Sequence, residues 1–227
     1  MKVRCPSFRW HEGRARERQQ IVDLFPKNGR SYIEPFAGSG NVFYEVINRR
    51  LHFKDYCLND TQSFLFDVER CKMGQFPVTV SRKSYEEWKK TDTPESRVLA
   101  RAITYGGKGY FAGFIGVNGY NRDTLLEAVW LARSMLKKAF LKKRDWSEFN
   151  YPAFGSFDFI YFDPPSRTDD QGKLAGLIDH EALVRLVRHA SFKWVLTHKP
   201  SGYYAARLQD YGYTSLGLSL GAWRNFR

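Results

Sequence analysis

Cysteine and long apolar runs are scarce in this chain of 227 residues. Its three cysteines, Cys5, Cys57 and Cys71, are odd in number and are not spaced like metal ligands, so we expect reduced thiols in a cytoplasmic protein. No apolar run is long enough to span a bilayer, and the N-terminal stretch lacks the apolar core of a signal peptide. We therefore expect no membrane partner.

Histidines are also few, and they are dispersed along the chain. His180 and His189 lie nine residues apart, and His198 follows a predicted strand, which is not the spacing of a metal site. We expect no metal and interpret these histidines as surface or cap residues.

Charge of one sign is in clear excess. The chain has 36 basic and 24 acidic residues, which gives a formal net charge of +12. A charge of this size on a small domain indicates an anionic partner such as nucleic acid, although it also serves solubility. Phosphate contacts position a protein on DNA and carry no sequence information. The length suits one domain with a full core and a small inserted region.

The strongest local signal is the stretch FDFIYFDPPS at residues 157–166. Five of its first six residues are apolar or aromatic, which is typical of a strand buried on both faces at the centre of a parallel sheet. Two prolines cannot continue a hydrogen-bonded ladder, so the strand must end before Pro164. Asp163 is thereby placed at the carboxyl end of the strand, where open α/β sheets bind their ligands.

The chemistry of Asp163, Pro164 and Pro165 suits recognition of a primary amine. Each proline ring fixes φ and removes an N–H, so the carbonyls of Asp163 and Pro164 are held at set angles. A planar amine could donate one hydrogen to the carboxylate and one to a carbonyl. A buried strand that simply ends in a polar turn explains these residues equally well, so a partner motif is needed.

A second motif is SYIEPFAGSG at residues 31–40, which predicts a strand and a glycine-rich turn, followed by a helix at residues 41–49. Gly38, Ser39 and Gly40 let the backbone approach a ligand and expose the helix N-terminus. The third glycine of a dinucleotide fingerprint is absent, which disfavours pyrophosphate binding. The turn alone is a weak signal.

Asp60 lies twenty residues after Gly40, at the end of a second short strand. A carboxylate at about that distance commonly binds the ribose hydroxyls of a nucleoside. Asp60 could also be the N-cap of a helix at residues 61–69, and the two roles are compatible.

The rest of the chain alternates between predicted helices and strands, which favours an α/β fold. We expect helices at residues 123–140, 179–190 and 203–211, and strands at residues 139–142, 192–197 and 213–220. Residues 73–121 differ, because basic residues mix with aromatics there and Pro94 begins a helix. This composition suits contact with phosphates and unstacked bases, although a flexible solvated loop has the same composition.

Taken together and in this order, SYIEPFAGSGNVF, LND and FDFIYFDPP resemble the D12-class, or Dam-like, DNA adenine-N6 methyltransferases. Residues 9–14 (RWHEGR) are similar to the N-terminal cofactor motif of that family, and residues 116–121 (GVNGYN) to its target-recognition segment. The resemblance implies a Rossmann-like, mostly parallel sheet flanked by helices. Residues 1–72 and 122–227 would form the methyltransferase domain, and residues 73–121 an inserted target-recognition region.

The resemblance also implies the members of the site. The cofactor S-adenosylmethionine would be bound by Trp10, Arg14, Glu34, Pro35, Phe36, Gly38, Ser39, Gly40, Asp60 and Asp163. The catalytic motif would be Asp163, Pro164 and Pro165. The substrate, double-stranded DNA, would be bound by Ser166, Arg167, Lys108, Tyr110, Asn118 and Tyr120.

The chain departs from the family pattern at two places. Ser166 stands where the family has an aromatic residue, normally tyrosine, and Glu12 and Arg14 replace a glycine and a lysine. The aromatic ring stacks on the extruded base, which is worth about 1–3 kcal/mol, so its loss weakens base capture roughly five- to 150-fold. We hypothesise that the guanidinium of Arg167 stacks on the base instead.

The implied reaction is transfer of a methyl group to adenine N6 of a flipped base, as in restriction-modification enzymes. Two alternatives stay open. Ser166 suggests a methyltransferase-fold protein that binds nucleic acid with impaired catalysis, and the Asp-Pro-Pro motif also suits a methylase of cytosine N4 or of an RNA base. A nicotinamide-dependent oxidoreductase is disfavoured by the missing third glycine. The recognition sequence and the oligomeric state are not fixed by these motifs.

Overall fold

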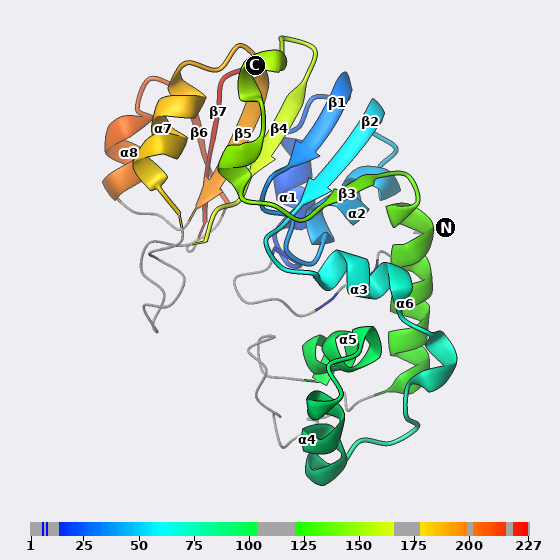
Figure 1. Cartoon of the computed structure of the whole chain (residues 1–227). Helices are drawn as coiled ribbons and strands as arrows, with labels where there is room; N and C mark the ends of the chain where they lie inside the picture. The colour runs from blue at the N-terminus through cyan, green and yellow to red at the C-terminus, as the bar shows by residue number, and fades with distance from the viewer. Residues whose placement is uncertain are drawn as a thin grey trace.

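A seven-stranded sheet lies at the centre of the computed structural model, which describes residues 6, 8, 14–103, 121–165, 178–198, 202–216 and 220–226 (Figure 1). The strand order is β3-β2-β1-β4-β5-β7-β6. The strands are β1 (Asn28–Glu34), β2 (His52–Asn59), β3 (Phe140–Lys142), β4 (Phe159–Phe162), β5 (Lys193–His198), β6 (Gly212–Ser215) and β7 (Gly221–Arg224).

The first five strands in this order are parallel, and only β7 runs antiparallel to its neighbours β5 and β6. This confirms the predicted α/β fold with a mostly parallel sheet. The chain leaves β1 toward β2 on one side and later returns to place β4 on the other side. The order of strands therefore reverses between β1 and β4, and open sheets of this kind bind ligands at such a point, outside the carboxyl ends of the strands.

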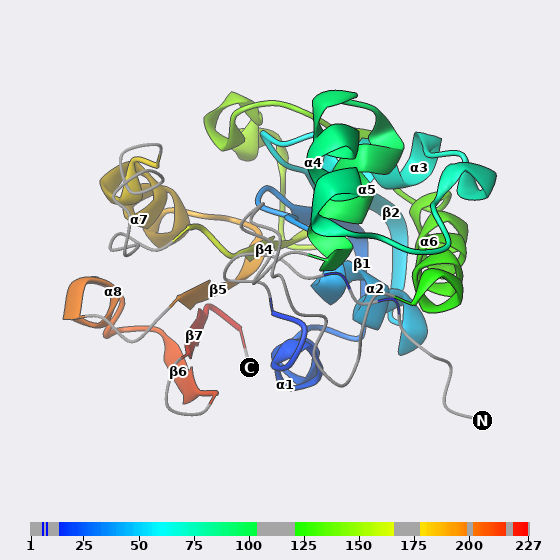
Figure 2. The ribbon, with the colours of Figure 1, turned by 90° about the horizontal axis from the view of Figure 1, so that it is seen from below.

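Helices cover both faces of the sheet (Figures 1 and 2). Because successive side chains of a strand point to opposite faces, Tyr32 and Tyr161 pack into one apolar cluster while Ile33 and Phe162 pack into the other. The first cluster includes residues of α1 (Arg18–Asp23), α2 (Asn41–Asn48), α3 (Phe64–Arg70) and α6 (Arg122–Leu136). The second includes residues of α7 (His180–Arg188) and α8 (Gly202–Arg207), with short 3-10 turns at Trp146–Glu148 and Tyr151–Ala153.

Two predicted elements differ from the structure. The helix expected to reach residue 140 ends at Leu136, and Phe140, with 66% of its side chain exposed, instead opens the edge strand β3. The strand expected at residues 213–220 ends at Ser215 as β6, and a second strand that was not predicted, β7, begins at Gly221 and pairs with it. The Leu216 N–H donates to the Leu220 carbonyl at 2.9 Å between the two strands. At Gly221 a Cβ atom would lie 2.8 Å from the Tyr213 ring, so the absence of a side chain lets the two strands approach.

The region between β2 and β3 contains helices α3, α4 (Arg82–Lys90), α5 (Pro94–Ile103) and α6, with a 3-10 turn at Met73–Gln75. Helices α4 and α5 lie outside the sheet, and α5 packs against α3 (Figure 1). Pro94 is the first residue of α5, as predicted. The division at residues 73 and 121 stays a prediction. None of the helices in the described ranges has both the length and the apolar content needed to cross a membrane.

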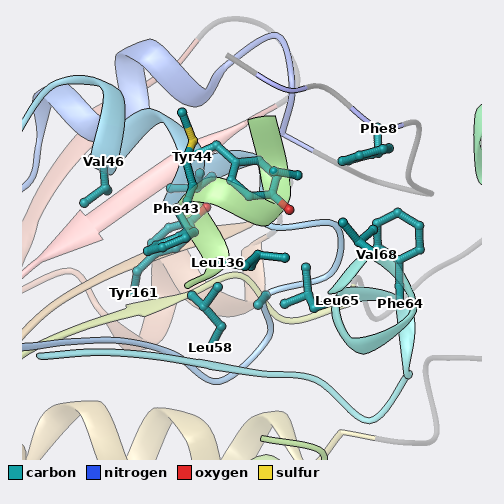
Figure 3. Packing of buried hydrophobic residues seen from close by; sticks show 14 of the residues in the cluster. Phe8, Phe43, Tyr44, Val46, Leu58, Phe64, Leu65, Val68, Leu136 and Tyr161 are labelled. Carbon is teal, nitrogen blue, oxygen red and sulfur yellow. The ribbon is translucent and has the colours of Figure 1, made fainter. Parts of the chain in front are cut away.

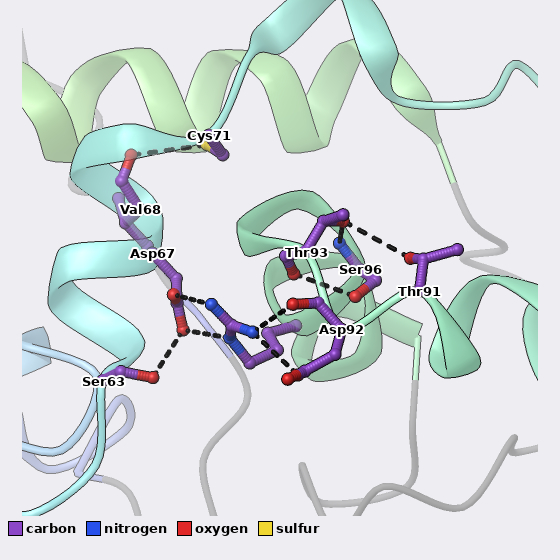
Figure 4. A network of polar contacts seen from close by, with 9 residues as sticks. Ser63, Asp67, Val68, Cys71, Thr91, Asp92, Thr93 and Ser96 are labelled. Atoms are coloured by element: carbon purple, nitrogen blue, oxygen red, sulfur yellow. Dashed lines mark hydrogen bonds and ion pairs between the residues drawn. The ribbon is translucent and has the colours of Figure 1, made fainter.

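Arg97 joins α5 to α3 through the network in Figure 4. Its Nε and Nη2 donate to the two carboxylate oxygens of Asp67 at 2.9 and 2.7 Å, and its Nη1 donates to the carbonyl and carboxylate of Asp92 at 2.6 and 2.7 Å. The hydroxyl of Ser63 also donates to Asp67, at 2.9 Å. Asp67 is buried, so this fork satisfies a carboxylate that has little access to water.

Replacing Arg97 by leucine should destabilise the protein, because the buried Asp67 carboxylate would lose its charged partner. We expect a loss of about 1–3 kcal/mol, below the range for a fully buried pair, since 37% of the Arg97 side chain is exposed. Urea denaturation measures this change. The exposed Arg82 serves as the control, and equal effects of Arg97→Leu and Arg82→Leu would contradict the role of the network.

Candidate active site

The turn after β1 has a backbone that only glycine adopts without strain. Gly38 and Gly40 have φ values of 54° and 76°. A Cβ atom on Gly40 would lie 3.0 Å from the Tyr44 ring. The N–H of Gly40 donates to the Ala37 carbonyl, and the N–H of Ala37 donates to the Asn59 carbonyl, both at 2.8 Å. The predicted turn is therefore stabilised by one hydrogen bond within the turn and by another to the end of β2.

Asp60 connects the same turn to the end of β2. One carboxylate oxygen accepts from the Gly38 N–H at 2.8 Å, and the other accepts from the Gln62 N–H at 2.9 Å. The alternative prediction, that Asp60 caps the next helix, is wrong, because α3 begins at Phe64 with Ser63 at its N-cap. Burial raises the pKa of Asp60, while these backbone hydrogen bonds and Arg101 lower it. A backbone hydrogen bond from Thr61 acts on the same carboxylate, which therefore keeps room for one further donor.

Asn59 is a structural member of the site that the sequence interpretation missed. Its amide group donates to the Pro35 and Arg144 carbonyls at 2.9 and 3.0 Å, and its oxygen accepts from the Arg144 N–H at 3.1 Å. It is fully buried. One side chain thus ties the turns that follow β1, β2 and β3. In the sequence, only its position just before Asp60, at the end of a predicted strand, indicated that Asn59 lies near the site.

Asp163 follows β4 and lies at the same edge of the sheet. Tyr32 pairs with Phe159 and Ile33 with Ile160, so the ends of β1 and β4 are level. The Asp163 side chain is 15% exposed and is therefore not sealed in the core. Pro164 is buried and Pro165 half-buried.

Three hydrogen bonds from described residues reach the Asp163 carboxylate, and all three end on Oδ1. Arg14 donates from Nε at 2.9 Å and from Nη2 at 2.7 Å, and the Thr197 hydroxyl donates at 2.8 Å. Burial raises the pKa of Asp163, whereas Arg14, Thr197 and His198 lower it, and the net shift is upward. Arg14 was predicted as a cofactor residue, and here it pairs with the predicted catalytic carboxylate.

Glu34, the last residue of β1, is buried beneath the glycine turn. It accepts hydrogen bonds from the Tyr32 hydroxyl and from the backbone N–H of Phe43 in the first turn of α2. Burial raises its pKa to about 8, and the nearby Asp163 carboxylate adds to this effect. Because Gly40, the N-cap of α2, has no side chain, Glu34 supplies an acceptor that such a helix start requires.

The start of the chain is attached to α2. The Phe8 N–H donates to the Asn41 side-chain oxygen at 3.4 Å, and the Asn41 amide donates to the Phe8 carbonyl at 3.1 Å. Figure 3 shows the Phe8 ring beside Phe64, with a centroid separation of 5.3 Å. Phe8 is therefore held next to Asn41, the first residue after the glycine turn. Asn41 was not singled out from the sequence.

Other predicted site residues have simpler surroundings. Pro35 and Ser39 are buried within the turn, and the half-buried Phe36 ring lies 5.9 Å from the Trp146 ring. Seven predicted residues lie outside the described part of the chain, so their roles stay predictions: Trp10, Lys108, Tyr110, Asn118, Tyr120, Ser166 and Arg167.

The interpretation of His180 and His198 as surface or cap residues is wrong. Both are buried, His198 at the end of β5 and His180 in the first turn of α7, and the Nδ1 atom of His180 lies 2.6 Å from the Tyr204 hydroxyl. The three aromatic rings pack together, so the apolar ring faces are satisfied in the core. No group of three His, Cys, Asp or Glu side chains suited to a metal occurs among the described residues.

Glu34→Gln should change how stability depends on pH. Because the folded-state pKa of about 8 exceeds the unfolded value of about 4.3, Glu34 stabilises the fold below the unfolded value, and this contribution is lost as pH rises through 8. We expect the unfolding free energy of the parent protein to fall more steeply between pH 5 and pH 9 than that of Glu34→Gln, by roughly 1.4 kcal/mol per pH unit at most. Urea denaturation at several pH values measures both slopes. Glu69→Gln, at an exposed position of α3, is the control, and parallel slopes for Glu34→Gln and the parent protein would contradict the assignment.

Solved structures resemble this chain only weakly in the two matches described next. A conserved hypothetical protein of Streptococcus pyogenes matches with a TM-score of 0.38 and 13% identity, over 92% of this chain and 95% of that one. A human methyltransferase 10 domain containing protein matches with a TM-score of 0.36 and 9% identity, over 92% of this chain and 78% of that one. Scores this low carry no argument about function.

Sequence comparisons are more specific. The chain is 26% identical over 175 residues to the modification methylase StsI of Streptococcus sanguinis, an alignment that covers 64% of this chain and 26% of the methylase. The chain thus spans about a quarter of the length of the curated relative it matches. The sequence model of the D12 class of N6 adenine-specific DNA methyltransferases matches residues 15–98, which include the glycine turn and Asp60. Over these residues the chain matches the D12 class, and the resemblance inferred from its motifs is confirmed.

Proposed function

We propose that this protein transfers a methyl group from S-adenosylmethionine to adenine N6 of a base extruded from DNA. The observation that carries the proposal is the placement of Asp163 and the glycine turn at one edge of the sheet, on the adjacent strands β4 and β1. The match of residues 15–98 to the D12 class supports the choice of reaction.

The donor set around the turn fits this cofactor better than a pyrophosphate. The Gly38 N–H, which a phosphate would need, is already donated to Asp60. Asp60 brings a carboxylate to the carboxyl edge of the sheet, and its charge repels an anion and attracts a cation, whereas the charge of Asp163 is paired with Arg14. When bound there, S-adenosylmethionine supplies an electrophilic methyl group on a positively charged sulfur. We assign Asp60 to bind the ribose hydroxyls of the cofactor.

The chain's own contribution to the reaction is to orient and stabilise the amine. The N6 lone pair of adenine is delocalised into the ring and is a poor nucleophile. Hydrogen bonds from N6 to the Asp163 carboxylate and to the Pro164 carbonyl favour a more tetrahedral nitrogen and stabilise the charge that develops on it. Arg14 and Thr197 both donate to Oδ1 of Asp163, so we assign Oδ2 as the acceptor of the hydrogen bond from the amine.

Double-stranded DNA is the proposed partner. The net charge of +12 suits the phosphate backbone. An adenine stacked inside a duplex cannot reach Asp163, so it must be extruded at a cost of a few kcal/mol. Residues 73–121 are the proposed target-recognition region, and α4 within it has four exposed basic residues, Arg82, Lys83, Lys89 and Lys90.

Asp163→Ala should abolish methyl transfer, because the amine loses its charged acceptor. We expect the rate to fall by at least about a hundredfold, while affinity for the cofactor changes by less than about tenfold. Transfer is measured with labelled cofactor and unmethylated DNA, and nucleoside mass analysis identifies the product. Calorimetry of cofactor binding is the control. Retention of the rate would refute the role of Asp163.

The same assay on the parent protein separates the alternatives. N6-methyladenine supports the proposal. Methylation of cytosine N4 or of RNA alone would assign another amine, and DNA binding without transfer would assign a binding protein with impaired catalysis.

Asp60→Asn should act on the cofactor and leave the chemical step unchanged. The amide keeps one acceptor but loses the charge, so we expect the Kd of the cofactor to rise about tenfold, which corresponds to one hydrogen bond to a charged group. The kcat at saturating cofactor should stay near that of the parent protein. Asp55→Asn, an exposed position on the same strand, is the matched control. An unchanged Kd in Asp60→Asn would contradict the assignment.

A further inference from the structure

Thr197 and Tyr161 form a buried pair of hydroxyl groups behind Asp163. Tyr161 lies in β4, two residues before Asp163, and Thr197 lies in the neighbouring strand β5. Phe162 pairs with Leu196, so Asp163 and Thr197 follow at the same level of the two strands. Neither hydroxyl-bearing side chain is exposed. Their hydroxyl oxygens lie 2.7 Å apart, and Thr197 Oγ1 lies 2.8 Å from Asp163 Oδ1.

The direction of these hydrogen bonds follows from the number of hydrogens. An ionised carboxylate only accepts, so Thr197 must donate its single hydroxyl hydrogen to Asp163. Tyr161 must then donate to Thr197. Burial raises the pKa of Tyr161 far above its usual range, so this phenol keeps its proton. The chain of donors therefore runs from Tyr161 through Thr197 to Asp163, and each bond polarises the next.

We propose that Thr197, supported by Tyr161, is a positioning residue that fixes the plane of the Asp163 carboxylate and presents Oδ2 to the amine of the substrate. This inference rests on the proposed methyl transfer. Thr197 acts through Asp163 and touches neither cofactor nor base.

Arg14 alone does not fix this plane. Its Nε and Nη2 both donate to Oδ1 from the end of a side chain with several rotatable bonds, so these contacts fix Oδ1 less tightly than a donor from the sheet does, and the carboxylate keeps some rotation about its Cβ–Cγ bond. Arg14 is also a long side chain from a turn before α1, whereas the Thr197 hydroxyl is attached to the interior of the sheet at a β-branched residue with restricted χ1. A second donor from a rigid element restricts the remaining rotation.

The groups that act on Asp163 come from each neighbouring element. Arg14 precedes α1, Glu34 ends β1, Tyr161 is in β4, and Thr197 and His198 end β5. The hydrogen bond from Thr197 lowers the pKa of Asp163. Removing it should raise that pKa, and because the ionised carboxylate is the active form, the acidic limb of the rate profile should move to higher pH.

The test compares Thr197→Val, which keeps the shape and loses the hydroxyl, with Thr197→Ser, which keeps the hydroxyl. Steady-state methylation of DNA gives kcat, the KM of the cofactor and the pH profile. We expect kcat of Thr197→Val to fall about tenfold or more, as for loss of a hydrogen bond to a charged group. The KM of the cofactor should not change. Thr197→Ser should restore most of the rate, and Tyr161→Phe should show a smaller effect in the same direction.

A measurement without turnover keeps the inference separate from the proposed function. Carboxyl-carbon NMR of labelled aspartate, assigned with Asp163→Asn, reports the pKa of Asp163 in the parent protein and in each variant. A higher pKa in Thr197→Val and a restored one in Thr197→Ser support the role of Thr197, whether or not the parent protein methylates DNA. Equal pKa values in all three would overturn it, as would equal rates of the valine and serine variants where the parent protein transfers methyl groups. Absence of transfer by the parent protein would overturn the proposed function alone.

Discussion

Two carboxylates, Asp60 and Asp163, must be kept in place at an edge of the sheet where burial disfavours their charge. Each carries a pKa raised by burial and lowered again by donors that the fold provides. For Asp60 the donors are backbone N–H groups of the glycine turn and of Gln62, and for Asp163 they are Arg14 and Thr197. These donors come from the ends of three strands, β1, β2 and β5, and from Arg14 before α1. The geometry of the site therefore depends on the whole parallel sheet.

Much of this arrangement could be predicted because it follows from short-range rules. An apolar run closed by two prolines had to end as a central strand, and β4 does so at Phe162. Gly38 and Gly40 indicated a turn, and both have positive φ values. The spacing of Asp60 from Gly40 and its place after a strand indicated that it lies near the turn, and its carboxylate accepts from the Gly38 N–H. In each case the residue type dictates the backbone within a few positions, and the parallel order of strands then places the ends at a common edge.

What could not be predicted depends on contacts between residues distant in sequence. In the sequence, Asn59 is predicted only to be the end of a strand. Its three hydrogen bonds to residues that follow β1 and β3 form only when these strands lie beside β2. Burial of His180 and His198 depends on α7 and α8 covering the sheet. The last predicted strand, residues 213–220, includes most of β6 but none of β7, because the apolar residues alternate up to Leu220 and periodicity does not record where one strand ends and the next begins.

The ion pair between Arg14 and Asp163 spans 149 residues, and Thr197 lies 34 residues further along. During synthesis the first of these residues emerges long before the last. Until β5 has joined the sheet, Asp163 lacks the hydrogen bond from Thr197. Contacts of such high sequence separation form late and slowly. An N-terminal fragment that ends before Thr197 therefore lacks one of the donors that hold Asp163.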